Sequence, residues 1–423
     1  MDRDLRARYA RVLADELVCA MGCTEPIAIA YCAALARRAL GLEPERVRVV
    51  ASPNVIKNVK SVVVPNTGGQ RGIAAAAAAG IVAGDADLRL EALSRVSAAQ
   101  VEAMGAYLST HAVEVAPSES GRAFEVEATV GAGVHEASCL IAGHHTNVVR
   151  LARDGEVLES APFEEAPSEA APDRPELSVA SIVEYADEAD LDDVRDVLLR
   201  QVECNMAIAR EGIEGGWGAC VGRTLLEAYG DSTHNRAKAL AAAGSDARMG
   251  GCELPVVINS GSGNQGLATS VPVVVYARDL GASEELMLRA LIVSNLCTIH
   301  LKTGIGRLSA YCGATSAGAG AAAGVAYLMG GRCREVSHVL VNALAIDSGM
   351  ICDGAKASCA AKIASAVEAG LLGLQMQLRD REFRGGDGIV EKGVENTIRN
   401  VSQVAREGMR ETDRTIIDLM CRC

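Results

Sequence analysis

Aromatic side chains are scarce in this chain of 423 residues: they make up 3% of it, with one Trp and three Phe. Proteins that bind nucleic acid without sequence preference stack bases on aromatic rings and follow the phosphates with Lys and Arg. The chain has no such aromatic series, no Lys/Arg-rich stretch and a formal net charge of −13, which argues against that kind of binding. Because 49% of the residues are still apolar, the core must consist of Ala, Val, Leu, Ile and Met. This composition favours helices packed closely through small residues.

Long hydrophobic runs are also missing. Residues 1–6 are mostly charged, and no apolar signal segment follows them. The Ala-rich runs at 73–83 and 317–329 have small side chains and are too short to span a bilayer. We therefore expect a cytoplasmic protein that has no membrane partner.

Cysteine, by contrast, is abundant, with 14 residues. In a reducing compartment disulfides are disfavoured, so the thiols are expected to be free, metal-bound or catalytic. Four of them lie among apolar residues and are expected to be small core side chains, namely Cys19, Cys32, Cys139 and Cys204.

The periodicity of the apolar residues predicts an α+β fold, in which a mixed domain with an antiparallel sheet accompanies a largely all-α catalytic domain. Helices are predicted at 5–20 and 27–40, and this N-terminal part, residues 1–45, is expected to pack on the helical domain. The mixed domain is predicted over residues 46–160. Its expected elements are strands at 47–52 and 62–64, a helix at 73–83 and the antiparallel sheet over 112–158.

The composition changes after this sheet. Residues 161–177 are rich in Pro, Glu, Ala and Ser, which is typical of a surface linker. Apolar residues at helical spacing then follow, interrupted by glycine loops, so that residues 178–423 predict the helical domain.

Three cysteines of this helical part lie in Gly/Ala-rich segments with polar neighbours. Cys352 and Cys359 are seven residues apart, and Cys312 lies 40 residues before Cys352. Three thiolates can bind three irons of a [4Fe–4S] cluster and leave the fourth iron open as a Lewis acid. The spacing alone leaves unrelated buried thiols or a zinc site open.

A lone thiol, Cys23, stands far upstream, just before Pro26. Pro suits the first turn of a helix, and a helix N-terminus lowers the pKa of a thiol. Glu25 would oppose that effect if its carboxylate faced the thiol. A thiol placed in this way can move a proton, although a buried structural Cys fits the local sequence equally well.

A glycine-rich polar loop follows the apolar residues 256–258. Its glycines, Gly261, Gly263 and Gly266, match the pattern G-x-G-x-x-G, but the β-branched run at 269–276 contains Pro272 and does not read as a clear helix. We therefore favour binding of a carboxylate over binding of a nucleotide, with a plain connecting loop as the alternative. The polar residues that would bind it are Ser260, Ser262, Asn264 and Gln265.

Other polar residues extend the list of substrate-binding candidates. Asn54 and Asn58 follow the first predicted strand, and Thr67 follows the second. His145 is preceded by His144, and adjacent histidines on a strand point in opposite directions, which argues against a two-His metal site. Lys356 lies between Cys352 and Cys359, but no phosphate-binding loop accompanies it or Lys362, so pyridoxal phosphate is not expected.

Taken together, these motifs resemble the L-cysteine desulfidase family, which is related to the catalytic alpha-chain-like domain of the iron–sulfur L-serine dehydratases. The resemblance runs in order from about residue 10 to beyond residue 400. It rests on the segments 22–26, 52–58, 64–68, 143–147 and 261–266, and on Cys312 with the segment 352–359.

The resemblance implies that Cys312, Cys352 and Cys359 hold a [4Fe–4S] cluster and that Cys23 removes the Cα proton of the substrate. The implied reaction is β-elimination of L-cysteine to hydrogen sulfide, ammonia and pyruvate, without pyridoxal phosphate. Related serine dehydratases place a C-terminal cysteine on the fourth iron, and Cys423 is the candidate for that role here, against a plain polar tail.

Two other functions stay open. The same fold and cluster would serve L-serine or L-threonine, because the difference depends on the shape of the pocket. A sulfur or cluster carrier without turnover is the alternative from another class. In each case the partner is a small molecule and not a nucleic acid, and a homodimer is left open as the assembly.

Overall fold

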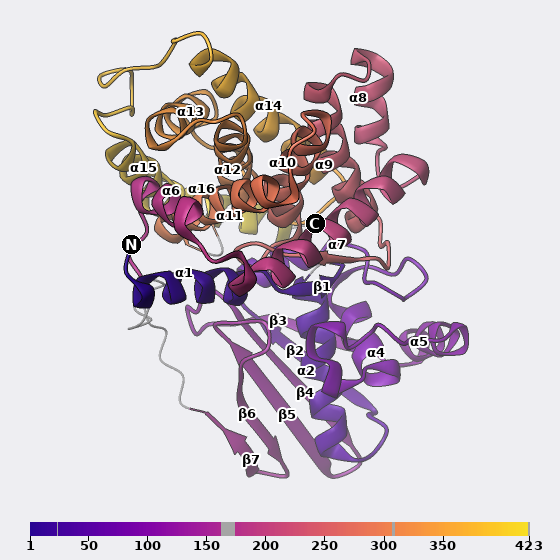
Figure 1. Cartoon of the computed structure of the whole chain (residues 1–423). Helices are drawn as coiled ribbons and strands as arrows, with labels where there is room; N and C mark the ends of the chain where they lie inside the picture. The colour runs from indigo at the N-terminus through magenta and orange to yellow at the C-terminus, as the bar shows by residue number, and fades with distance from the viewer. Residues whose placement is uncertain (23, 162–173, 307–308, 422–423) are drawn as a thin grey trace.

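The computed structural model describes residues 1–22, 24–161, 174–306 and 309–421, and its architecture is α+β, as the sequence predicts. A mixed body carries a six-stranded sheet, and a larger body is nearly all helical (Figure 1). Each body has its own hydrophobic core. Residues of the two bodies come together where the connecting segments pass from one body to the other.

The large sheet has the strand order β3-β2-β4-β5-β6-β7. Its strands are β2 (Arg46–Ala51), β3 (Val113–Pro117), β4 (Glu125–Ala132), β5 (His135–Ala142), β6 (Val148–Arg153) and β7 (Glu156–Ser160). All neighbours are antiparallel, except that β2 and β3 are parallel. A parallel pair needs a long crossover. The crossover contains α3 (Pro53–Val59), α4 (Gly72–Ala83), the short 3-10 helix η1 (Ala86–Glu91) and α5 (Ala98–Thr110).

The strand predicted at 62–64 is wrong. The structure has only an isolated antiparallel bridge between Val63 and Arg71 at this point. Pro65 follows directly, and the chain then turns through Asn66 and Gly68, both at positive φ, so no ladder can extend.

The two N-terminal helices separate. α1 (Arg3–Glu16) buries Tyr9 and Leu13 in the core of the helical body, whereas α2 (Thr24–Leu40) packs on the sheet and on α4. The expectation that residues 1–45 pack together on the helical domain is therefore wrong for α2. The physical reason is that α2 is apolar on nearly every side, and a Cβ on Gly80 of α4 would lie 2.1 Å from the carbonyl oxygen of Ala30, so the helices cross in close contact.

The helical body is built from long helices that contact through small residues. A Cβ on Gly212 would lie 1.9 Å from the carbonyl oxygen of Ala243, and one on Gly318 would lie 2.3 Å from that of Ala366. Such contacts leave no room for large side chains, which agrees with the scarcity of aromatic residues. The helices are α6 (Val179–Glu188), α7 (Arg195–Glu214), α8 (Val221–Tyr229), α9 (Thr233–Met249), α10 (Gly263–Asp279), α11 (Glu284–Ile305), α12 (Gly313–Leu328), α13 (Cys333–Ile346), α14 (Cys359–Gln377), α15 (Val394–Gln403) and α16 (Arg410–Cys421).

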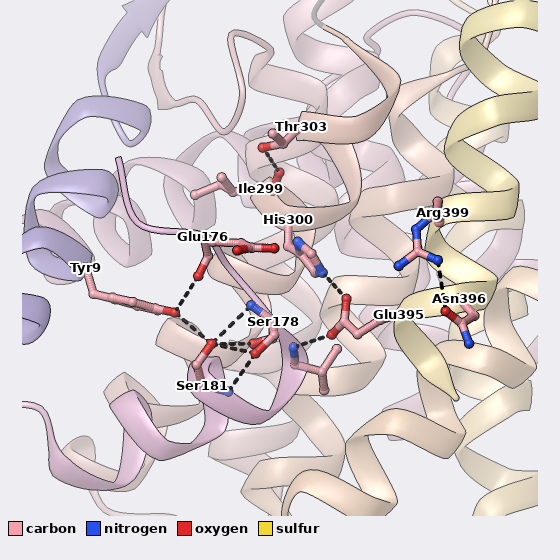
Figure 2. A network of polar contacts seen from close by, with 11 residues as sticks. Tyr9, Glu176, Ser178, Ser181, Ile299, His300, Thr303, Glu395, Asn396 and Arg399 are labelled. Atoms are coloured by element: carbon pink, nitrogen blue, oxygen red, sulfur yellow. Dashed lines mark hydrogen bonds and ion pairs between the residues drawn. The ribbon is translucent and has the colours of Figure 1, made fainter. Parts of the chain in front are cut away.

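A polar network joins α1 to three of these helices, namely α6, α11 and α15, where they meet (Figure 2). Nε2 of His300 on α11 lies 2.7 Å from Oε2 of Glu395 on α15, and Oε1 of Glu395 accepts a hydrogen bond of 2.7 Å from the N–H of Val179 at the start of α6. The hydroxyl of Tyr9 on α1 donates to Ser181 of α6. The network thus links α6 directly to α1 and α15, and through Glu395 to α11.

A second, two-stranded sheet links the bodies: β1 (Cys19–Met21) pairs antiparallel with β8 (Pro255–Val257). β1 leads directly to α2, and β8 leads to the glycine-rich turn before α10. The pairing therefore brings the start of α2 next to the start of α10. None of the described helices has the length and apolar character that crossing a membrane requires.

Candidate active site

The chain brings Cys312 and Cys352 together, although 40 residues separate them in the sequence. An antiparallel bridge pairs their neighbours Tyr311 and Ile351. On either side of the bridge, the N–H of Cys312 donates to the carbonyl of Met350 at 2.8 Å, and that of Cys352 donates to the carbonyl of Ala310 at 2.6 Å. The interaction between the two thiols is the largest cause of the pKa shift of each.

The third thiol, Cys359, approaches the same place from the start of α14. Its Sγ lies 3.7 Å from the carbonyl oxygen of Gly354, within the turn that begins at Cys352. Gly354 has a φ of +93°, and a Cβ there would lie 2.3 Å from the carbonyl oxygen of Lys57, so only glycine fits. Cys312 is the N-cap of α12 and Cys359 is the first residue of α14. Helix N-termini favour negative charge, which suits thiolates at both positions.

Electrostatics favour a thiolate at the centre of this group. The hydrogen bond from the Cys312 thiol, together with the backbone N–H of Gly354 and the ammonium groups of Lys57 and Lys302, outweighs burial and lowers the pKa of Cys352 to about 5. The same hydrogen bond and burial raise the pKa of Cys312, and burial raises that of Cys359. One deprotonated thiol therefore coexists with two that retain their protons until a metal displaces them.

The cations beside Cys352 come from α3 and α11, outside the segments that carry the three cysteines. Lys57 on α3 is 3% exposed, and its ammonium group pairs with Oδ1 of Asp413 on α16 at 2.5 Å. Lys302 near the end of α11 is also buried. Lysine is rarely buried without a partner, so the burial of Lys57 and Lys302 is the feature that identifies them as part of the site. The sequence alone could not show it.

No three His, Cys, Asp or Glu side chains in the described part of the chain converge closely enough to hold a single metal ion. A [4Fe–4S] cluster makes a different demand, because each thiolate binds a different iron and the thiolates do not meet at one point. The neighbouring thiols of Cys312, Cys352 and Cys359, placed at helix N-termini and beside buried cations, fit such an anionic cluster.

The glycine loop forms a tight turn rather than an open loop. Asn259 and Ser262 exchange two backbone hydrogen bonds of 3.1 and 3.0 Å. Between them Ser260 and Gly261 both have positive φ, 49° and 80°, as a type I′ turn requires. The turn projects from β8 toward the start of α2, where the hydroxyl of Thr24 donates to the carbonyl of Gly261 at 3.3 Å.

The interpretation that no clear helix follows this turn is wrong. α10 begins at Gly263 and runs through Pro272 to Asp279. The β-branched residues are tolerated because α10 is buried from Gln265 to Ala277, so that packing and not intrinsic preference decides its conformation. The N–H groups of its first turn have no side-chain cap and offer a site for an anion. This geometry supports the expectation of carboxylate binding, and it suits a phosphate equally well.

The polar side chains around this helix start differ in their contacts. Gln265 is buried, lies against Gly313 at the start of α12, and has an Oε1 atom without a hydrogen-bond partner among the described residues. Asn264 accepts a hydrogen bond from Arg248 at 3.1 Å. Ser262 is the N-cap of α10 but makes no capping hydrogen bond, whereas the Ser260 hydroxyl donates to Asn259 at 2.8 Å. Gln265 thus connects the turn with the cysteine group.

The mixed body contributes a second set of side chains. Nδ2 of Asn58 donates to Oε1 of Glu25 at 3.0 Å, which joins α3 to the start of α2. The Cε1 atom of His145 lies 3.8 Å from the position of a Cβ on Gly261. Oδ1 of Asn54 is buried and has no hydrogen-bond partner in the described part of the structure. Asn58 thus faces the start of α2, and His145 faces the glycine turn. Asn54 lies one helical turn before Asn58 on α3.

Two predicted substrate-binding residues have structural contacts instead. The hydroxyl of Thr67 donates to the carbonyl of Val64 at 2.7 Å and closes the turn in which it lies. Lys356 forms an ion pair with Asp353, and Lys362 pairs with the same carboxylate at 2.6 Å. Both ammonium groups hold the pKa of Asp353 at about 2 against the opposing effect of its burial. Neither lysine is therefore arranged as a free amine for pyridoxal phosphate.

Cys23, the predicted base, and Cys423, the predicted fourth ligand, lie outside the described residues. The neighbours of Cys23 are described. The carbonyl of Gly22 accepts a hydrogen bond of 2.9 Å from Nε of Arg248, the residue that also contacts Asn264. On the other side Thr24 contacts Gly261, so both flanking residues are attached to the glycine turn and the start of α10.

Residues 87–418 match the family model of the serine dehydratase alpha chain. The chain is 53% identical to a UPF0597 protein of Desulfitobacterium hafniense over 97% of its own length and 96% of that protein. A UPF0597 protein of Lachnoclostridium phytofermentans is 46% identical over 97% and 98% of the two chains, and one of Bacteroides fragilis is 36% identical over 99% of both. The names of these relatives state no activity, whereas the family model covers most of the chain, including all three clustered cysteines: the protein belongs to the serine dehydratase alpha chain family.

Proposed function

We propose that the protein is an iron–sulfur-dependent lyase that removes hydrogen sulfide from L-cysteine by β-elimination, leaving ammonia and pyruvate. The observation that carries the proposal is that the segments bearing Cys312, Cys352 and Cys359 come together beside a glycine turn and the first turn of α10, whose N–H groups have no side-chain cap. Membership of the serine dehydratase alpha chain family supports lyase chemistry in general.

The three cysteines would hold a [4Fe–4S] cluster, with Cys423 as the proposed fourth ligand of the resting enzyme. Such a cluster supplies a soft Lewis acid for a leaving thiolate. The buried ammonium groups of Lys57 and Lys302 would balance the negative charge of the bound group. This division of roles needs no pyridoxal phosphate.

Substrate binding falls to the residues that surround the start of α10. A carboxylate would accept hydrogen bonds from the N–H groups of its first turn, where the macrodipole favours an anion. The free Oε1 of Gln265 is an acceptor and suits the substrate ammonium group. Ser262, Asn54 and Asn58 complete the proposed binding set on the two sides of the turn.

Cys23 would remove the Cα proton, because its two flanking residues are attached to the turn that binds the carboxylate. Loss of this proton and of the Cβ–S bond forms the Cα–Cβ double bond of aminoacrylate. Aminoacrylate then hydrolyses to pyruvate and ammonia. The N–H groups at the carboxylate stabilise the negative charge that develops as the proton leaves.

L-Serine is the second candidate substrate, and the match to the serine dehydratase alpha chain favours it. The elimination is the same apart from a hydroxyl leaving group in place of a thiol. Because one atom distinguishes the substrates, the two amino acids must be compared directly in one assay.

The test is an anaerobic assay of the reconstituted protein with L-cysteine and, separately, L-serine, following pyruvate together with sulfide. Pyruvate and sulfide from cysteine, lost on iron chelation and retained after removal of pyridoxal phosphate, are the expected result. Pyruvate from serine alone would assign a dehydratase. No product from either amino acid, with an intact cluster spectrum, would favour a cluster or sulfur carrier.

A cluster with an open iron is sensitive to oxygen, so the proposal also places the protein in a reducing cytoplasm. The described cysteines are all free thiols, which supports this placement.

A further inference from the structure

Two cysteines outside the candidate active site are held against each other. Cys19 on β1 is the register partner of Val257 on β8. Asn205 on α7 holds the same Val257 with two hydrogen bonds, donating to its carbonyl at 3.1 Å and accepting from its N–H at 2.9 Å. Cys204 is the neighbour of Asn205, so both cysteines are placed around one residue, and Cys19 packs against the hydrophobic core that contains Cys204. The interaction between the two thiols is the largest cause of the pKa shift of each.

A cation accompanies the pair. Arg200 lies four residues before Cys204 on α7, which places both side chains on one face of the helix. The Cys19 thiol is the first cause of the raised pKa of the Arg200 guanidinium group. The hydrogen bond from Cys204, followed by that from Arg200, lowers the pKa of Cys19 to about 6, while the pKa of Cys204 is raised. A thiolate thus stands next to a protonated thiol.

Exposure distinguishes this pair from another pair of neighbouring cysteines. Cys19 is partly exposed at the edge of the helical core, whereas Cys204 is 9% exposed. Cys32 and Cys139 in the mixed body are both fully buried, and the thiol of Cys32 donates to the carbonyl of Cys139 at 3.1 Å. Burial raises the pKa of Cys32. Oxidation selects exposed thiolates, so the two pairs should react differently.

We propose that Cys19 and Cys204 form a peroxide-reactive dithiol that closes to a reversible disulfide. The Cys19 thiolate attacks one oxygen of hydrogen peroxide, the O–O bond breaks, and a sulfenic acid forms while hydroxide leaves and takes up a proton as water. The sulfur of Cys204 then attacks the Cys19 sulfur, the S–O bond breaks, and the Cys204 proton leaves with the hydroxyl as a second water. With hydrogen peroxide, one oxidant is consumed for each disulfide.

The disulfide would join β1 to α7 just before the segment that contains Gly22 and Thr24. Both residues contact the elements around the glycine turn, so the modification site lies next to the candidate active site without belonging to it. The proposal does not depend on the lyase reaction, because it concerns only the state of two thiols.

The test is peptide mapping of the full-length protein after treatment with hydrogen peroxide, alkylation under denaturing conditions and tryptic digestion. The expected product links the peptide of residues 12–37 to that of residues 201–210 through Cys19 and Cys204. Free-thiol signal at these two positions should be largely lost and should return on treatment with dithiothreitol. Cys32 and Cys139 should keep their free-thiol signal under the same conditions.

Five variants test the link. Cys19→Ser and Cys204→Ser should each abolish it, whereas Cys32→Ser and Cys23→Ser should retain it. Both of the latter matter because Cys23 and Cys32 share the tryptic peptide of residues 12–37 with Cys19. Arg200→Gln should slow its formation. A link that persists in Cys19→Ser, or wild-type Cys19 and Cys204 that stay as free as Cys32, would overturn the proposal without touching the assignment of the lyase.

Discussion

Close contact between helices α12 and α14 should decide both stability and the spacing of the cysteine group. Gly318 lies on α12, and a Cβ on it would stand 2.3 Å from the carbonyl oxygen of Ala366 on α14. Ordinary contact begins at 3.4 Å, so Gly318→Ala requires the helices to separate by about 1 Å. The obstacle is backbone, which no change of rotamer can relieve.

The magnitude follows from two opposing effects. Overpacking of a core costs about 1–3 kcal/mol, and the rigid obstacle places this site at the upper end. Replacing Gly by Ala inside a helix returns about 0.5–1 kcal/mol. The expected net loss for Gly318→Ala is therefore about 2 kcal/mol in the free energy of unfolding.

The matched control is Gly105, which lies inside α5 of the mixed body. Its Cβ would meet only Nε2 of Gln70 at 3.7 Å, an ordinary van der Waals contact with a flexible side chain. Gly105→Ala gains the helix propensity without the clash and should stabilise the chain by about 0.5–1 kcal/mol. The same chemical change thus has opposite signs at the two positions.

The assay is thermal unfolding of both variants and the wild type, followed by circular dichroism under identical anaerobic conditions. The midpoint should fall for Gly318→Ala and stay level or rise for Gly105→Ala. The iron bound on reconstitution provides a second readout: because α12 starts at Cys312 and α14 at Cys359, it should fall only for Gly318→Ala. A Gly318→Ala protein as stable as Gly105→Ala would refute the argument from close packing.

The remaining predictions concern charge and the cysteine group. Burial alone would raise the pKa of Glu395, but hydrogen bonds from the imidazole of His300 and the backbone N–H of Val179 lower it below its ordinary value of 4.5. The contribution of Glu395 to stability is therefore present above pH 4.5 and is lost as pH falls through the lowered pKa. Glu395→Gln should reduce the difference between the unfolding midpoints measured at pH 6 and at acid pH, and an unchanged difference would contradict this. Lys57→Met removes the partner of a carboxylate on α16 and should increase proteolytic cleavage within that helix more than Lys60→Met does, since Lys57 is buried in its ion pair whereas Lys60 is exposed and donates to the backbone carbonyl of Met420 near the end of the helix; equal cleavage would contradict the assignment. Cys23→Ala should retain the brown absorbance of the cluster and lose turnover, whereas Cys352→Ala should lose both; an active Cys352→Ala protein without iron would exclude the proposed mechanism.

The sequence predicted those parts of the fold that depend on local pattern. The antiparallel strands β4 to β7 have an alternation of period two, and the helix at 73–83 has an Ala-rich run, so each is specified within its own segment. The first part of the predicted antiparallel region was wrong, because β3 lies at the edge of the sheet and pairs with β2 in parallel. The position of α2 and the helical state of residues 269–276 were not predicted. Both depend on burial on all sides, and a segment that is apolar all round carries no direction that tells which body it joins.

The candidate site divides in the same way. The polar residues of the glycine turn could be selected from composition, because Gly, Ser and Asn in a short run are typical of a turn. The contribution of Lys57, Lys302 and Arg248 could not, since each is a single charged residue in an unrelated segment and only the tertiary structure buries it near the others. Cys19 and Cys204 were interpreted as inert core residues for the same reason: Arg200, which distinguishes them, lies 181 residues from Cys19 in the sequence.

The arrangement of helix starts supplies the positive potential with which a chain of net charge −13 would bind the proposed carboxylate substrate and the proposed anionic cluster at one place. The first turns of α2 and α10 meet through Thr24 and Gly261, and those of α10 and α12 meet through Gln265 and Gly313. The start of α14 joins them through Cys359. Each helix N-terminus carries a partial positive charge of about half a unit, and the effect is local to the first turn. Positive potential is therefore concentrated at the site without any cluster of basic residues in the sequence, which is why charge counting alone could not locate it.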